Sequence, residues 1–247
     1  MQLHDLTWPD VEDYLQRSDG LMIPIGSTEQ HGPSGVIGTD AMVAKAIARE
    51  TGVRSDLLVG PLLSIGVAEH HMAFPGTLSL RPSTLIALLQ DYLHSLAQHG
   101  FRQFFFINGH GGNIATLKAA FSEIQTGERE RGGQRPLRCT LVNWYEVAEV
   151  VRLRKQYYGD QEGRHATPSE IAVIQYLRPD LIRKQPLPPP GPLQSEVQGA
   201  ADFRAKYPDG RMGSWPDLAT PAQGQVLFDA AVRGLAQQVP TFFSEGG

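Results

Sequence analysis

Apolar residues form short, nearly continuous runs along the chain, and between these runs apolar positions recur at the spacing of helical turns. Continuous apolar runs of this length are typical of strands that are buried on both faces of a sheet. We expect such strands at residues 21–25, 57–65, 103–107 and 137–143. Helices are expected at residues 41–50, 82–99 and 114–125, and after the Thr-Pro pairs at residues 167–168 and 220–221.

This alternation of strands and helices predicts an α/β fold in which a largely parallel sheet is covered by helices on both faces. In such sheets, ligands gather beyond the carboxyl ends of the strands. The proline-rich residues 185–195 are expected to run extended over the surface. The remaining residues, 196–247, are too few to bury a second core, so we expect residues 1–247 to form a single domain.

The composition excludes several classes of protein. The chain has 22 basic and 26 acidic residues and a net charge of -4, and it lacks a basic stripe with interleaved aromatics, so nucleic acid is not an expected partner. No run approaches the roughly eighteen apolar residues that a membrane span requires. The single cysteine, Cys139, excludes an internal disulfide, and we expect a cytoplasmic protein in a reducing compartment.

The first candidate site follows the expected strand at residues 21–25. It reads Gly-Ser-Thr-Glu-Gln-His-Gly-Pro at residues 26–33 and Gly-Thr-Asp at residues 38–40. In an extended stretch Glu29 and His31 project to the same side, so a carboxylate and an imidazole can reach one ion. Asp40 returns nine residues later at the start of an expected helix, where a capping role is an equally good explanation.

The second candidate site also follows a strand, and it reads Asn-Gly-His-Gly-Gly-Asn at residues 108–113. Glycines around His110 let backbone amides approach a ligand closely, and the histidine can face a metal at the edge of the sheet. A glycine-rich turn before a helix could instead hold a phosphate. The turn matches neither the dinucleotide-binding pattern nor a Walker loop, and this disfavours a phosphate.

The third candidate site is Gly-Arg-His-Ala-Thr-Pro-Ser-Glu at residues 163–170. Thr167 and Glu170 have the spacing of a capping box, which explains Glu170 without any metal. His165 precedes the helix and is suited to proton transfer near neutral pH. Taken together, the three segments supply carboxylates and imidazoles without a thiolate, a donor set that suits zinc, manganese or Fe(II).

These segments, together with Phe-Pro-Gly-Thr at residues 74–77, resemble the signatures of the creatininase (creatinine amidohydrolase) family over about residues 5–240. The resemblance implies a three-layer α/β/α sandwich, a homohexamer and a centre of two divalent metal ions bridged by Asp40. By position, Glu29 and His110 join Asp40 on one ion, and His31 joins it on the other. The resemblance gives His165 a role in substrate binding and proton transfer.

The chain departs from creatininase itself at two places. Creatininase has a ligand glutamate at the second position after the histidine of the glycine turn, where this chain has Gly112. We assign the missing carboxylate to Glu170, as family members with this form of the turn suggest. The chain also lacks an aromatic cluster just before His165, where creatininase has a tryptophan against its substrate, so creatinine is not the expected natural substrate.

Further residues are candidates for contacts with the substrate. Glu69 and His70 precede the Phe-Pro-Gly-Thr segment and are expected beside the pocket, although a role in holding loops together is slightly favoured over contact with the substrate. The backbone amides of Gly111 and Gly112 are placed to stabilise an oxyanion. The aromatic residues of the nearby apolar runs are assigned to the core, namely Trp144, Tyr145 and Tyr176.

The predicted function is hydrolysis of a C–N bond in a small amide, cyclic amide or formamide by a metal-bridging hydroxide. One alternative is a formamide hydrolase acting on a nucleotide-like intermediate, which a basic cluster of Arg81, Arg102 and Arg164 at the pocket mouth would favour. A second alternative is a non-catalytic metal-binding protein with the same fold. A third is a nucleotide-dependent enzyme that uses the glycine turn at residues 108–113.

Overall fold

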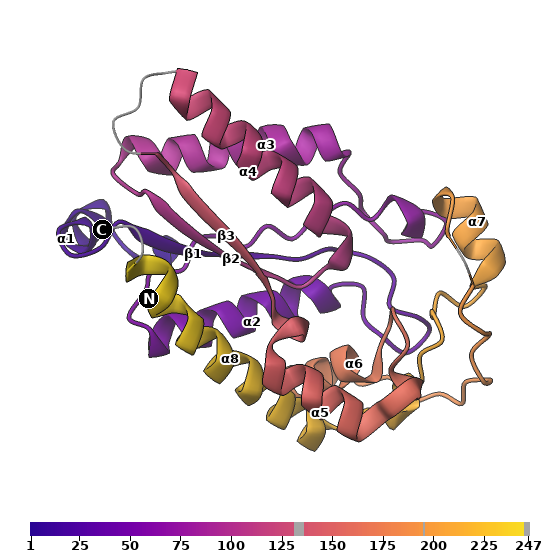
Figure 1. Ribbon diagram of the computed structural model, residues 1–247. Helices are drawn as coiled ribbons and strands as arrows, with labels where there is room; N and C mark the ends of the chain where they lie inside the picture. Colours follow the sequence, from indigo (N-terminus) through magenta and orange to yellow (C-terminus); the bar gives the residue numbers. More distant parts are fainter. Residues whose placement is uncertain (131–135, 195, 245–247) are drawn as a thin grey trace.

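The computed structural model describes residues 1–130, 136–194 and 196–244 (Figure 1). Within them, three parallel strands form one sheet in the order β1 (Gly20–Ile25), β2 (Gln103–Asn108) and β3 (Arg138–Asn143). The register pairs Leu21 with Phe104 and Phe104 with Cys139, so the three strands end level with one another. The loops that leave their carboxyl ends therefore start from one edge of the sheet.

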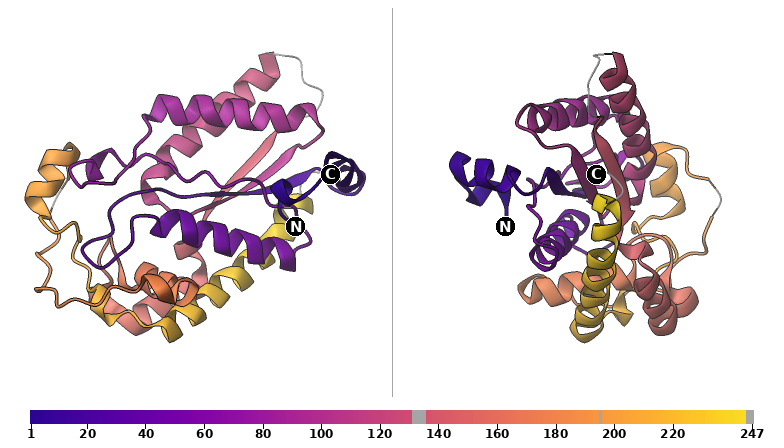
Figure 2. Two further views of the ribbon diagram at one scale, coloured as in Figure 1. Left: turned by 180° about the vertical axis from the view of Figure 1, so that it is seen from behind. Right: turned by 60° about the vertical axis from the view of Figure 1, so that its left-hand side comes forward.

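Helices cover both faces of the sheet, as the sequence predicts (Figures 1 and 2). One face carries α3 (Pro82–Gln98) and α4 (Ile114–Glu130). The other face carries α2 (Thr39–Arg54), α5 (Ala148–Tyr158), α6 (Pro168–Leu177) and α8 (Pro221–Ser244). The short helices α1 (Trp8–Leu15) and α7 (Gly199–Lys206) lie at opposite ends of the molecule. The three-layer α/β/α prediction is confirmed, although sequence reasoning did not anticipate α1, α5 or α7.

Alternate residues of each strand enter two different cores. Leu21 and Phe104 pack with Leu89 and Phe121 from the α3–α4 layer. Their neighbours Met22 and Phe105 pack instead with residues from the layer of α2 and α8. Because both faces are covered, every position of β1 and β2 is buried, which explains why their apolar runs are continuous rather than alternating.

The prediction of a strand at residues 57–65 is wrong, because this segment forms no regular strand. This segment runs parallel to β1 but pairs with it only through isolated bridges, between Met22 and Val59 and between Ile25 and Leu63, and Val59 also bridges to Gln2. Gly60 N donates to Met22 O at 2.8 Å, but Pro24, next in the pairing pattern of β1, has no N–H to return a bond. The regular pairing is therefore interrupted. Pro24 O accepts from Leu63 N at 3.0 Å, one residue later than regular parallel pairing after Gly60 would require.

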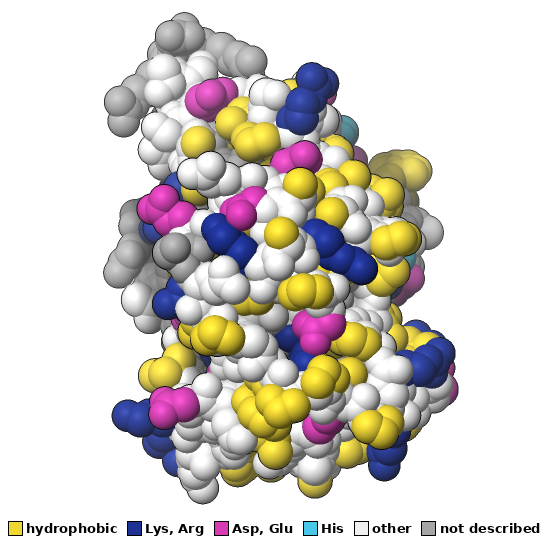
Figure 3. Space-filling model, turned by 90° about the vertical axis from the view of Figure 1, so that its right-hand side faces the viewer, with side chains coloured by type: hydrophobic (Ala, Val, Ile, Leu, Met, Phe, Trp, Pro, Cys, Tyr) yellow, Lys and Arg dark blue, Asp and Glu magenta, His cyan; other side chains and the backbone are white. Residues whose placement is uncertain are grey.

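Residues 185–194 of the expected surface excursion form neither helix nor strand, and most of them are exposed. Hydrogen bonds tie the segment to the loop after α7, from Arg211 Nη2 to Pro188 O at 2.7 Å and from Gln194 N to the Tyr207 hydroxyl at 2.9 Å. On the side of the molecule that carries α7, Lys and Arg side chains are interspersed with Asp, Glu and apolar ones (Figure 3). No helix among the described residues is long and apolar enough to cross a bilayer.

The two-sided core makes a testable prediction about α3. Leu89 is fully buried against the sheet, whereas its neighbour Leu88 is 39% exposed. Replacing Leu89 with alanine should lower the free energy of unfolding by about 2–5 kcal/mol, because it removes buried apolar surface and leaves a cavity. Leu88→Ala is the matched control and should change it by no more than about 0.5 kcal/mol. Urea denaturation of both variants checks this, and equal losses would contradict the assignment of the buried face.

Candidate metal centre

The carboxyl edge of the sheet brings together the residues that the sequence predicts as ligands. Glu29 and His31 follow β1, His110 follows β2, and Asp40 and Glu170 lie in the first turns of α2 and α6. Asp40 Oδ1 lies 3.0 Å from His31 Nε2, and Asp40 Oδ2 lies 3.1 Å from His110 Nδ1. His110 Nδ1 is also 3.2 Å from Glu29 Oε1. Segments distant in sequence thus form one compact cluster.

Two glycines allow this close approach of α2 to the strand ends. A Cβ atom on Gly26 would lie 2.5 Å from Ala41 N, and one on Gly109 would lie 2.4 Å from Asp40 O. Neither position can hold a larger residue without displacing the backbone of α2. The glycines therefore bring the first turn of α2, with Asp40, directly against the turns that follow β1 and β2.

Two asparagines of the glycine turn, to which the sequence analysis gave no role, lock three loops together. Asn108 Nδ2 donates to His110 O at 2.7 Å and to Asn143 Oδ1 at 2.8 Å, which joins the ends of β2 and β3. Asn113 donates through Nδ2 to Gly26 O at 2.9 Å and accepts from Val67 N at 3.0 Å. These bonds fix the loop that carries His110 relative to the loop that carries Glu29.

The buried carboxylates indicate that the cluster is built for cations. Glu29 is fully buried and Asp40 is 3% exposed, yet neither oxygen of Glu29 nor Oδ2 of Asp40 accepts a hydrogen bond from any residue that the structure describes. An unpaired buried carboxylate is costly unless it is protonated, paired with a cation or bound to a metal. Donor atoms within 4.8 Å of one another form two groups that share Asp40, namely Glu29–Asp40–His110 and His31–Asp40–Glu170. These donors fit divalent ions.

The histidine rings are held so that one nitrogen of each faces the carboxylates. His110 Nε2 lies 3.0 Å from Val67 O, and His31 Nδ1 lies 3.1 Å from Glu29 O. In a neutral ring the nitrogen next to a carbonyl carries the proton and donates it, which leaves the other nitrogen with a lone pair. His110 Nδ1 and His31 Nε2 are therefore both oriented to act as ligands.

The electrostatic field of the cluster attracts positive charge. Burial opposes protonation of His31, but Asp40 outweighs it, with help from Glu170 and Glu29, and raises the pKa of the ring to about 10. The pKa of His110 is also raised well above its usual range, because Glu29 and Asp40 outweigh its burial. Burial is the main effect on Glu170 and raises its pKa to about 6, although His31 acts in the opposite direction. The field that holds protons on the histidines also favours cations.

Glu170 takes part in the helix cap and in the cluster at once. Glu170 Oε2 accepts from Thr167 N at 2.9 Å, and Glu170 N donates to Thr167 Oγ1 at 3.3 Å, which completes the capping box. Glu170 also belongs to the donor group with His31 and Asp40. A carboxylate has two oxygens, so the cap and a metal-binding role do not exclude each other.

The lack of space around Gly112 prevents the glycine turn from supplying a carboxylate to the cluster. A Cβ atom at this position would lie 2.4 Å from both His110 Nε2 and Val67 O. A glutamate there would displace the ring of His110 and the backbone that holds it. At Gly111, in contrast, a Cβ would meet only the hydroxyl of Tyr145, at an ordinary contact distance of 3.6 Å.

His165 lies beside the cluster with one ring nitrogen turned toward it. Its Nε2 is 2.8 Å from Gln30 O, and its Nδ1 is 3.7 Å from Glu29 Oε1. Burial, and next the charge on His31, lower the pKa of the ring well below its usual range. His165 also forms a third possible donor group with Glu29 and His31. The geometry therefore leaves Nδ1 free to accept a proton or to bind a cation.

His71 is a member of the cluster that the sequence analysis did not select. The ring is 1% exposed, its Nε2 lies 3.4 Å from Glu29 Oε1, and its Nδ1 lies 2.9 Å from Gln30 Nε2. The Gln30 amide also donates to Gly210 O at 3.0 Å, so it donates to His71 Nδ1 and leaves the ring proton on Nε2, facing Glu29. Sequence could not separate His70 from His71, because only the turn at Glu69–His71 decides which ring points inward.

A cavity of about 210 Å³ opens onto the cluster. His70, Gly111 and Gly112 line it, whereas Glu69 is exposed and is not among its lining residues. Tyr145, assigned to the core from sequence, also lines the cavity. Further lining residues are Arg154, Arg164 and Met212.

The predicted basic cluster of Arg81, Arg102 and Arg164 does not form at the mouth of the cavity. Of its three members only Arg164 lines the cavity, and its side chain is exposed. Arg102 donates to the carbonyls of Ala97 and Phe101, just before the amino end of β2, and Arg81 precedes α3. Arg154 also lines the cavity, but its Nε donates to Glu162 Oε1 at 2.7 Å.

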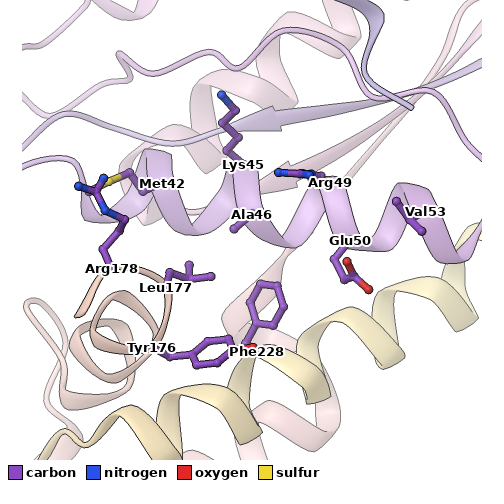
Figure 4. A pocket seen from close by; sticks show the side chains of 10 residues that line it. All are labelled: Met42, Lys45, Ala46, Arg49, Glu50, Val53, Tyr176, Leu177, Arg178 and Phe228. Atoms are coloured by element: carbon purple, nitrogen blue, oxygen red, sulfur yellow. The ribbon is translucent and has the colours of Figure 1, made fainter. Parts of the chain in front are cut away.

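A second hollow, of about 620 Å³, lies between α2, α6 and α8 (Figure 4). Its floor includes Met42, Leu177 and Phe228, with Lys45 and Arg49 nearby on α2. The one carboxylate that lines it, Glu50, is paired with Arg54 at 3.5 Å. Despite its larger volume, this groove offers no group of donors comparable to the cluster at the strand ends.

Comparison with known proteins agrees with this geometry. The family model described as creatininase, creatinine amidohydrolase, matches residues 4–239. The chain belongs to the creatininase family. A mycofactocin precursor peptide peptidase of Mycobacterium tuberculosis is 30% identical over 243 residues, which cover 90% of this chain and 87% of that protein. A creatinine amidohydrolase of Pseudomonas putida is 25% identical over 248 residues, which cover 95% and 94%.

Solved creatininases share the fold of this chain. One, named Creatininase Mn, has a TM-score of 0.86 at 26% identity and covers 98% of both chains. Another, a mutant described as Zn-Zn type, has a TM-score of 0.86 at 25% identity. As a member of the creatininase family with a buried cluster of His, Asp and Glu, the chain is a metal-dependent amidohydrolase.

The two neighbouring glycines of the turn give a prediction about stability. Gly112→Ala should lower the free energy of unfolding by about 1–3 kcal/mol, because its Cβ forces His110 and Val67 apart. Gly111→Ala is the control, since its Cβ meets only the Tyr145 hydroxyl at an ordinary distance. Chemical denaturation of the metal-free proteins measures both. Equal tolerance at the two positions would show that position 112 can hold a side chain.

Proposed function

We propose that the chain binds two divalent ions, one at Glu29, Asp40 and His110 and one at His31, Asp40 and Glu170, and hydrolyses a C–N bond of a small substrate. The observation that carries this proposal is the fully buried Glu29, whose oxygens accept no hydrogen bond from the described residues, beside an Asp40 shared by two donor groups. The substrate classes are small amides, cyclic amides and formamides. The relative that is a peptidase adds short peptides to this range.

When bound, two divalent ions supply Lewis-acid polarisation of the substrate carbonyl and activation of water. His165, held by its bond to Gln30 O, directs Nδ1 toward the cluster and passes a proton to the leaving nitrogen. Gly111 and Gly112 lie at the amino end of α4, where the positive end of the helix dipole favours a developing oxyanion. The Nε2–H of His71 lies 3.4 Å from Glu29 Oε1 and helps to offset the charge of the carboxylate.

The cavity favours a small anionic substrate over a nucleotide-like one. A volume of about 210 Å³ suits a small molecule, and the exposed side chain of Arg164, which has no ion pair among the described residues, lines the cavity where it can meet a carboxylate. A phosphorylated nucleotide would need the larger basic cluster that Arg81 and Arg102 do not provide. Relatives with zinc and manganese forms support these two metals for this chain. The hexameric assembly and the cytoplasmic location stay predictions.

Metal content tests the proposed centre directly. Elemental analysis of chelator-free protein reloaded with zinc should give about two ions per chain. Asp40→Asn should reduce this to well below one, because both donor groups lose their shared carboxylate, whereas Glu170→Gln should retain about one. Glu149→Gln, which removes a carboxylate paired with Arg233 on the surface, is the control and should bind as the wild type does. Absence of bound zinc in the folded wild type would refute the centre.

Substrate charge tests the role of Arg164. Of two probes of similar size, N-formylglycine should be hydrolysed with a higher kcat/KM than the uncharged N-formylglycinamide. Arg164→Gln should raise KM for the anionic probe about tenfold, the loss expected for one charged hydrogen bond, and leave the neutral probe unaffected. Arg152→Gln is the control, because Arg152 is exposed on α5 and does not line the cavity. Equal effects on both probes would contradict recognition of a carboxylate.

A further inference from the structure

Tyr145 places an unpaired hydroxyl in the wall of the catalytic cavity. Its oxygen is buried and forms no hydrogen bond with any residue among those described. Buried hydroxyls are nearly always paired, because leaving one unpaired costs free energy, and an exception calls for a cause such as a catalytic role. Tyr145 therefore differs from Tyr14, whose hydroxyl donates to Gly20 O at 2.7 Å.

The surrounding structure fixes the position of the Tyr145 backbone and ring. Tyr145 lies in the 3-10 turn Trp144–Glu146, directly after β3 ends at Asn143. Arg154 donates through Nη1 to Tyr145 O at 2.9 Å, and its guanidinium lies 6.0 Å from the centre of the tyrosine ring. Arg154 is held in turn by Glu162. The hydroxyl is thus positioned by contacts that do not involve the hydroxyl itself.

The hydroxyl lies over the amino end of α4 and close to the carboxylates of the cluster. It is 3.6 Å from the point where a Cβ of Gly111 would lie. Burial, followed by the charges of Glu146, Glu170 and Asp40, raises the pKa of Tyr145, so the hydroxyl stays protonated and can donate. The Tyr145 hydroxyl and the backbone of Gly111 therefore line the same region of the cavity.

We infer that the Tyr145 hydroxyl donates a hydrogen bond to the carbonyl oxygen of the substrate as that oxygen becomes negatively charged. The inference rests on the proposed function only in taking the substrate to contain an acyl C–N bond. In the reaction the oxygen of water bonds to the carbonyl carbon, and the π electron pair moves to the carbonyl oxygen. The electron pair then returns to re-form the C=O bond as the C–N bond breaks. The nitrogen leaves as an amine with one proton of the water, and the second proton passes from the new carboxylic acid to the amine or to solvent, which leaves a carboxylate. Tyr145 keeps its proton throughout.

The first experiment separates this role from a structural one. Tyr145→Phe should leave the thermal midpoint unchanged or raise it, because the lost hydroxyl has no partner among the described residues. Tyr14→Phe, far from the centre at the amino end of β1, should lower the midpoint because the hydrogen bonds of its hydroxyl with Gly20 O, Leu58 N and Ser18 Oγ are lost. A clear loss of stability in Tyr145→Phe would show that the hydroxyl has a structural partner and would overturn the inference.

The second experiment measures the hydrogen bond without requiring turnover. Acetohydroxamic acid offers an anionic oxygen to a metal centre, and calorimetry of zinc-loaded protein gives its affinity. Tyr145→Phe should bind it at least about tenfold more weakly with unchanged zinc content, and Tyr14→Phe should bind it as the wild type does. Equal affinity in Tyr145→Phe, or no binding by a zinc-loaded wild type, would overturn the inference and leave the metal centre standing. A wild type without zinc would instead refute the proposed function.

Discussion

The structure around the site depends on one electrostatic constraint, which is the burial of Glu29 and Asp40 beside Glu170 and several histidines. Like charges so close together are unfavourable in a medium of low dielectric constant, and desolvation adds to the cost. The raised pKa values of His31 and His110 show how the cluster responds, since each ring attracts a proton to balance the carboxylates. Divalent ions meet the same requirement with more charge, and this makes metal binding the natural state of the cluster.

The fold places two of the clustered carboxylates where backbone dipoles help to hold negative charge. Asp40 and Glu170 lie in the first turns of α2 and α6, and His110 precedes the turn that opens α4. Parallel strands that end in register bring these helix starts to one edge of the sheet, and the close contacts at Gly26 and Gly109 complete the approach. Secondary structure and electrostatics thus favour the same location.

Sequence was sufficient for the layers of the fold and for the segments that meet at the site, because continuous apolar runs and polar residues at strand ends both have a direct physical meaning. Prediction from the sequence failed where one missing N–H group or the orientation of one side chain determines the local structure. The missing N–H of Pro24 interrupts a strand at residues 57–65, and one turn selects His71 rather than His70 to face Glu29. Tyr145 lies in an apolar run, so only the direction of its ring separates a core residue from a residue of the cavity wall.

The absence of a side chain at Gly112 and the position of the third carboxylate, Glu170, are linked. A Cβ at position 112 would lie 2.4 Å from a backbone atom and a ring atom, which excludes a side chain there, and the donor group of His31 and Asp40 takes its further carboxylate from Glu170 in the first turn of α6. At Gly111, in contrast, a Cβ would meet only the Tyr145 hydroxyl, at 3.6 Å, and both residues line the cavity. If Glu170 supplies the carboxylate from α6, as we propose, Gly111 stays without a side chain, and the cavity beside it is lined by Gly111 and Tyr145.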